Sequence, residues 1–139
     1  MKPATWKVYC DGGARGNPGP AAAAFVVEVN NKVIAKDAKF LGNTTNNTAE
    51  YQAAILALKW LAKNGNDLPS EITFVHDSEL IARQLAGLYK IKNEGLRNLY
   101  FSAKSLEKTI TAKIKYVSVP RTHNKIADYL VNRILDENS

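Results

Sequence analysis

The chain has 139 residues, 45% of them hydrophobic, and its 19 Lys and Arg against 13 Asp and Glu give a formal charge of +6. This size predicts one domain, residues 1–139, with its functional site on the fold that supplies its stability. The single cysteine, Cys10, excludes an intramolecular disulfide, and the longest apolar run, 21–27, is too short to cross a bilayer, so we expect a cytoplasmic, membrane-free monomer.

The first elements in the chain are predicted to be strands. Alternating Trp6, Val8 and Cys10 indicate a strand over residues 5–10, which we expect to end in a turn at residues 11–13, DGG. Apolar runs over 21–29 and 33–41 flank the turn-forming residues 30–32, NNK, and predict a hairpin. Three antiparallel strands therefore come first.

The rest of the chain alternates helices with short strands. Apolar residues at helical spacing predict helices over 48–64, 79–86, 95–108 and 125–135, and β-branched runs predict strands over 72–76 and 112–119. This order favours an α/β fold, a five-stranded mixed sheet flanked by helices. In it, the strands at 5–10 and 72–76 can lie side by side in parallel.

The charge excess lies in the second part of the sequence. Residues 1–80 hold eight Lys and Arg against eight Asp and Glu, whereas residues 81–139 hold eleven against five. A basic surface of this kind gains affinity for a polyanion by displacing counterions from phosphates. A solubilising excess of charge explains the same count equally well.

Four acidic residues fall where such a fold would bring them together. Asp11 and Asp77 end the two parallel strands, while Glu50 and Asp128 lie in the first turns of their helices. Each acid also has an ordinary structural explanation: Asp11 in a turn, Asp77 as a helix cap, and Glu50 and Asp128 as partners of helix dipoles. If the four converge, divalent cations would offset their repulsion, and metal-assisted phosphodiester hydrolysis is the chemistry implied.

Four sequence blocks, in the same order as in that family, resemble the motifs of type 1 ribonucleases H. They are residues 9–20 (YCDGGARGNPGP), 43–50 (NTTNNTAE), 76–78 (HDS) and 124–128 (NKIAD). The segment between the second and third helices is short, which resembles the compact subgroup described from archaea. A P-loop is excluded as a reading of the glycine-rich block because no Gly-Lys-Ser/Thr follows it.

The resemblance implies a ribonuclease H-like fold and an endonuclease that hydrolyses the RNA strand of RNA/DNA hybrids. It implies Asp11, Glu50, Asp77 and Asp128 as catalytic ligands of two Mg²⁺ ions, with Mn²⁺ as a substitute, and 5′-phosphate and 3′-hydroxyl products. The compact subgroup adds double-stranded RNA as a second substrate to test.

The resemblance also implies contacts with the hybrid. Asn17, Asn46 and Asn47 match positions at its minor groove, where the 2′-hydroxyl distinguishes RNA from DNA. The other candidate contacts are Thr45, Lys92 and Asn93 on the phosphates of the DNA strand, and Arg121 and Asn124 near the fourth acid.

A histidine in the loop before the fourth acid is common in the family. Here His123 directly precedes the block at 124–128, so either it or Arg121 serves at the phosphate, and we expect His123 to take part in catalysis. His76 is predicted to have only a packing role.

Two other classes of function remain open. One is a hybrid-binding module that has lost catalysis, which the presence of all four acids disfavours. The other is a different nuclease of the same superfold, such as a resolvase or transposase core or a reverse-transcriptase domain.

Overall fold

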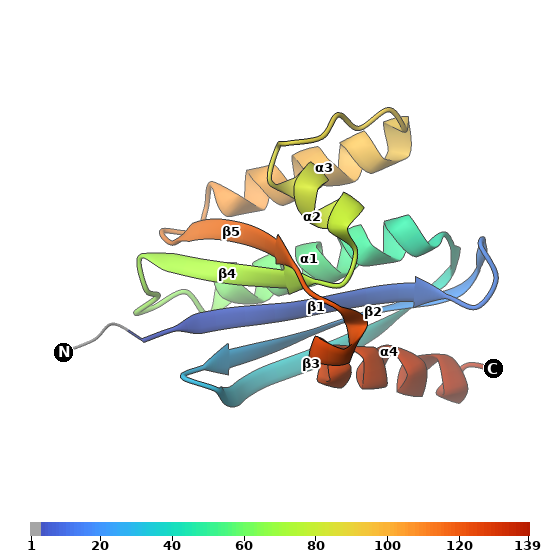
Figure 1. Cartoon of the computed structure of the whole chain (residues 1–139), viewed down its shortest axis with the longest axis horizontal. Helices are drawn as coiled ribbons and strands as arrows, with labels where there is room; N and C mark the ends of the chain where they lie inside the picture. Colours follow the sequence, from blue (N-terminus) through green and yellow to red (C-terminus); the bar gives the residue numbers. More distant parts are fainter. Residues whose placement is uncertain (1–3) are drawn as a thin grey trace.

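The computed structural model describes residues 4–139, which form one mixed five-stranded sheet with helices on both faces (Figure 1). The elements in chain order are β1 (Trp6–Ala14), β2 (Gly19–Val29), β3 (Lys32–Thr44), α1 (Asn46–Lys63), β4 (Glu71–His76), α2 (Glu79–Leu85), α3 (Glu94–Glu107), β5 (Lys113–Ser118), the 3-10 turn η1 (Arg121–His123) and α4 (Lys125–Glu137). The predicted α/β class and the order of elements are confirmed.

The strands lie in the order β3-β2-β1-β4-β5. β1 pairs antiparallel with β2 and parallel with β4, while β2 is antiparallel to β3 and β4 is parallel to β5. The expected three antiparallel strands followed by parallel ones are therefore present, with β1 at the centre.

The main hydrophobic core lies between α1 and the sheet. Tyr51 and Leu58 of α1 are fully buried against Val8, Phe25 and Phe74 of the strands. Burying such side chains is worth roughly 1.5–3 kcal/mol each, so this layer fixes the position of α1 over β1 and β2.

A smaller core lies on the other face, where α4 packs on β2. Ala22, Ala24 and Val26 of β2 contact Val131 and Leu135 of α4, and all are buried. Because residues alternate along a strand, Ala23 and Phe25 face α1 instead. The small side chains of β2 allow helices to pack closely on both faces of the sheet.

Within residues 4–139, none of the helices has the length and the apolar content that a bilayer-spanning helix needs.

Candidate active site

Strand β1 runs through the predicted turn instead of ending before it. It continues to Ala14, with Asp11 opposite Ala24 of β2, and the bend falls at residues 15–18. The parallel pairing with β4 ends at Tyr9 and Val75. Two residues further along the chain lie Asp11, still in β1, and Asp77, just after the end of β4. The two carboxylates therefore lie level, as expected, although Asp11 is inside its strand.

Gly12 explains how Glu50 reaches them. A Cβ on Gly12 would lie 2.2 Å from the backbone carbonyl carbon and oxygen of Ala49, so α1 crosses β1 with no room for a side chain. The backbone N–H of Gly12 then donates to Oε1 of Glu50 at 2.9 Å. The glycine is required by this close approach and not by a turn.

Asp11, Glu50 and Asp77 form one cluster. Each offers a carboxylate oxygen that lies within 4.8 Å of the others, and Asp11 and Glu50 are only 5% and 4% exposed. Burial, followed by repulsion from neighbouring carboxylates, raises the pKa of both Asp11 and Glu50 well above their ordinary values. Such an arrangement is costly unless a cation compensates the charge.

The donor set fits a hard divalent cation. All the atoms offered are carboxylate oxygens, which Mg²⁺ and Mn²⁺ prefer. Oδ2 of Asp77 is buried and has no hydrogen-bond partner among the described residues, although the Arg121 guanidinium lies 3.7 Å away. A buried carboxylate oxygen left in this state has a free lone pair for a metal ion.

The structure tests the ordinary explanations of these acids. Ser78, not Asp77, caps α2, because its hydroxyl accepts from the N–H of Ile81. Helix α1 starts at Asn46, two residues before the predicted start, so its first turn contains no acid and Glu50 lies beyond it. Only Asp128 remains in a first helical turn.

Asp128 lines the same cleft as the cluster but lies outside it. The side-chain NH₂ of Asn132, one turn later on α4, lies 3.0 Å from the backbone carbonyl oxygen of Asp128 and 3.4 Å from its Oδ1. Arg15, in the bend after β1, reaches Asn132 and pairs with Asp136 at 2.6 Å. The sequence analysis did not identify Arg15 or Asn132 as site residues. The four-residue spacing of Asp128 and Asn132 was a usable signal, because it places these two side chains on one face of a helix.

His76 is the other residue that sequence reasoning undervalued. Its Nδ1 lies 3.3 Å from Oε2 of Glu50, and the side chain is completely buried. Burial lowers the pKa of His76 to about 4, so the imidazole is neutral at pH 7.

The three predicted asparagines lie where the β1–β2 bend meets the start of α1. Oδ1 of Asn17 accepts from the N–H of Asn46, and Oδ1 of Asn46 accepts from the N–H of Ala14. Asn46 and Asn47 line the cleft, and Asn17 is exposed beside it. With both Oδ1 atoms used internally, the NH₂ groups of Asn17 and Asn46 are the donors left for a ligand.

The side chains of Arg121 and His123, both on the short η1 turn, lie in different cavities. Arg121 lines the cleft and faces Asp77, and its side chain is 79% exposed. His123 lines a different cavity of about 240 Å³, with Tyr9 and Glu28. The structure does not bring His123 to the carboxylates, so the catalytic role expected for it has no support in the geometry.

Asn124 is almost completely buried. Its side chain is 1% exposed, and its NH₂ donates to the carbonyl oxygen of Cys10 at 2.8 Å, which ties the start of α4 to β1. Its Oδ1 is also buried and has no hydrogen-bond partner among the described residues, so the geometry supports a structural role, and contact with the hybrid stays a prediction.

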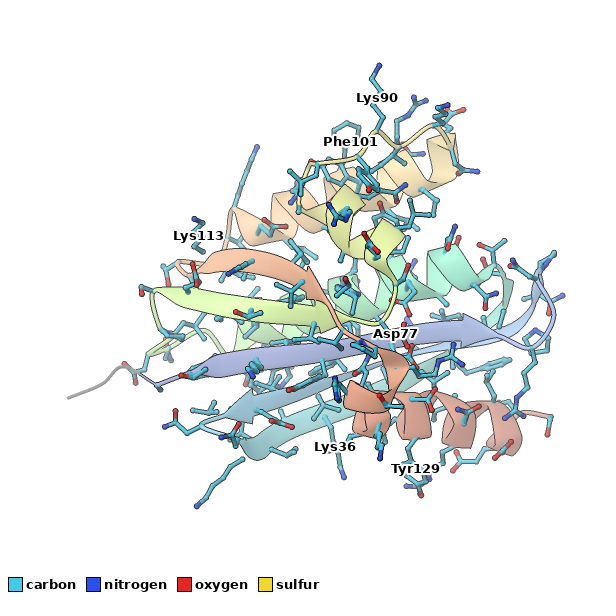
Figure 2. The ribbon with its side chains drawn as sticks, in the orientation of Figure 1. Lys36, Asp77, Lys90, Phe101, Lys113 and Tyr129 are labelled. Atoms are coloured by element: carbon cyan, nitrogen blue, oxygen red, sulfur yellow. The ribbon has the colours of Figure 1, made fainter. Side chains whose placement is uncertain are left out.

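The remaining predicted residues lie outside the cleft. Thr45 caps α1 through the N–H of Thr48, and Asn93 caps α3 through the N–H of Leu96. Lys92 lines a separate cavity of about 560 Å³ on the α2–α3 side, and in Figure 2 the labelled neighbours Lys90 and Phe101 lie on that side, away from Asp77.

The cleft as a whole has a volume of about 430 Å³ and combines acids with hydrogen-bond donors. Its lining comprises Asp11, Gly12, Gly13, Ala14, Arg15, Asn46, Asn47, Glu50, Asp77, Ser78, Arg121, Asp128, Val131, Asn132 and Leu135. It can hold cations beside a polyanion.

Known proteins resemble this chain over almost its whole length. The family model described as RNase H matches residues 3–135. Ribonuclease HI of Halobacterium salinarum is 38% identical over 130 residues, which cover 93% of this chain and 63% of that protein. A bifunctional protein of Mycobacterium tuberculosis is 37% identical over 131 residues, and the chain spans only 35% of its length.

Solved structures of RNase H1 proteins have the same fold as this chain. The crystal structure of LC11-RNase H1 in complex with an RNA/DNA hybrid superposes with a TM-score of 0.91 at 37% identity, covering 96% of this chain and 99% of that one. RNase H1 of the halophilic archaeon Halobacterium salinarum gives a TM-score of 0.87 at 35% identity, covering 96% and 98%.

Proposed function

The chain belongs to the ribonuclease H family, and on that premise we propose that it is an endonuclease that hydrolyses the RNA strand of RNA/DNA hybrids. The observation that carries the proposal is the buried cluster of Asp11, Glu50 and Asp77, whose oxygens lie within 4.8 Å of one another at the floor of an open cleft. A hybrid-binding module without catalysis would have no need of so costly a cluster.

The carboxylates are proposed to hold two Mg²⁺ ions, or Mn²⁺ in their place. Asp11, Glu50 and Asp77 supply the buried ligands, and Asp128 supplies a carboxylate at the edge of the same cleft. When bound, such ions activate the attacking water and stabilise the leaving oxygen, which yields 5′-phosphate and 3′-hydroxyl ends. The chain holds its own carboxylates in place through the N–H of Gly12 and the side chain of Asn132.

The asparagines are proposed to recognise the RNA strand. The NH₂ groups of Asn17 and Asn46, together with Asn47, can donate to base edges and 2′-hydroxyls in the minor groove. The interlocked Oδ1 bonds fix the orientation of the first two amides before substrate arrives, so little side-chain entropy is lost on binding.

Arg121 is proposed to serve the scissile phosphate in place of His123. Its exposed guanidinium can donate charge-assisted hydrogen bonds to phosphate oxygens and offset their charge. Thr45, Lys92 and Asn93 are proposed to contact phosphates of the DNA strand further along the duplex.

The test is cleavage of a labelled RNA strand in a hybrid, with Mg²⁺, Mn²⁺ or EDTA. We expect metal-dependent cutting that Asp77→Asn abolishes and that Asp37→Asn, an exposed acid of β3, leaves unchanged. Tight binding of the hybrid without cutting in either metal would reject the enzyme and favour the binding module. Cutting of branched DNA with neglect of the hybrid would favour another nuclease of the superfold, and matched double-stranded RNA tests the second substrate.

A further inference from the structure

His76 lies at the end of β4 with its side chain on the α1 side of the sheet. It continues the alternation of Ile72 and Phe74, which are fully buried in the core under α1. Its backbone is held as well, because its carbonyl oxygen accepts from the N–H of Val119 at 2.8 Å. A completely buried polar ring costs stability unless it has a partner.

That partner is the carboxylate of Glu50. Nδ1 of His76 lies 3.3 Å from Oε2, and the other oxygen, Oε1, accepts from the N–H of Gly12 at 2.9 Å. Glu50 is thus held on one side by β1 and on the other by β4. As a metal ligand Glu50 is ionised and can only accept hydrogen bonds, so Nδ1 of His76 must then carry a proton.

The other ring nitrogen supports this assignment. Nε2 of His76 is buried and has no hydrogen-bond partner among residues 4–139. A protonated Nε2 would leave a buried donor unsatisfied, whereas the Nδ1–H form directs the only donor of the ring at Glu50. The ring of Tyr116 lies 6.0 Å from that of His76 between centroids, tilted by 35°.

We propose that His76 is a positioning residue that, through its Nδ1–H, fixes the rotation of the Glu50 carboxylate so that its free lone pairs face the metal site. This inference rests on the proposed function, because Glu50 is a ligand only if the site binds metal. Partners of metal ligands commonly contribute about 10- to 100-fold to metal affinity or activity. The 3.3 Å separation is long for a hydrogen bond, so we expect the lower end, about tenfold.

Two substitutions separate the hydrogen bond from simple packing. His76→Phe keeps a ring in the cavity and removes the donor, while His76→Asn keeps a donor near the Nδ1 position and leaves a void. If His76 positions Glu50, the Phe variant loses about tenfold in Mn²⁺ affinity and the Asn variant retains most of it. If His76 only fills space, the Asn variant is the more impaired of the two.

The readouts are isothermal titration of Mn²⁺ into each protein, thermal unfolding, and the metal concentration at half-maximal cleavage of the hybrid. Wild-type affinity in His76→Phe, or loss of affinity that follows loss of stability across both variants, would overturn the proposal. Calorimetry does not require turnover. If the wild-type protein bound Mn²⁺ but did not cleave the hybrid, the proposed function would be rejected, and the effect of His76 on Mn²⁺ affinity would still be measured.

A measurement on the unmodified protein covers the case in which a variant does not fold. Nitrogen chemical shifts of the imidazole, recorded with Mg²⁺ present, distinguish a protonated Nδ1 from a protonated Nε2. The Nδ1–H tautomer is expected, and the Nε2–H tautomer would rule out donation to Glu50.

Discussion

Gly12→Ala is the substitution whose effect the structure fixes most closely. The new Cβ would lie 2.2 Å from the carbonyl carbon and oxygen of Ala49 and 2.5 Å from the N–H nitrogen of Glu50. These are backbone atoms of α1, so no side-chain rotation relieves the clash. The helix must move away from β1, which also breaks the bond between the Gly12 N–H and Glu50.

The magnitude follows from overpacking. Extra methyl groups in a packed interior cost about 1–3 kcal/mol, and a rigid backbone neighbour places Gly12→Ala at the upper end, about 3 kcal/mol. With an unfolding entropy of about 2.1 cal/mol/K per residue, that loss lowers the Tm by about 10 °C for a chain of this length.

Gly13→Ala is the matched control. A Cβ there would meet only Oδ1 of Asn46 and Cγ1 of Val131, both at 3.9 Å, which is ordinary contact. Chemical denaturation of both variants measures the difference in the free energy of unfolding, and calorimetry with Mn²⁺ measures the site. A Gly12→Ala protein within about 0.5 kcal/mol of wild type would refute the close-approach argument.

Three further outcomes are expected. Asn124→Ala removes a buried bond to Cys10 and should lower the free energy of unfolding by about 1–3 kcal/mol in urea, and a neutral result would contradict its structural role. Arg121→Ala should slow hybrid cleavage about tenfold while His123→Ala cuts at the wild-type rate, and the reverse ranking would restore the histidine. The raised pKa of Asp11 means that, above the ordinary carboxyl pKa of about 4, the unfolded chain loses a proton that the folded state keeps. Without metal, the Tm should therefore fall between pH 7 and 9, and Asp11→Asn should flatten the fall; equal slopes in EDTA would contradict the shift.

The sequence predicted the sheet and the convergence of acids well because both depend on local periodicity and on strand order. It misplaced the end of β1, because a glycine pair after an apolar strand usually indicates a turn. Here Gly12 serves a contact with Ala49, 37 positions away in the chain, and no local pattern reports such a contact.

The directions of the side chains on η1 could not be predicted from the sequence either. Arg121 and His123 are two positions apart in a single 3-10 turn, and only the packed structure separates one into the cleft and the other into a different cavity. His76, by contrast, left a signal. A histidine in phase with Ile72 and Phe74 had to face the core, and a buried imidazole there needed a polar partner.

The bond between Asn124 and Cys10 joins residues 114 positions apart, and the four cleft carboxylates come from four separate stretches of chain. During synthesis the chain emerges from its N-terminus, so Asp11, Glu50 and Asp77 are available long before α4 can dock on β2. A chain whose growth has stopped short of α4 lacks Asp128 and the anchor on Cys10. The four-carboxylate cleft is therefore complete only after α4 has been synthesised and has docked on β2.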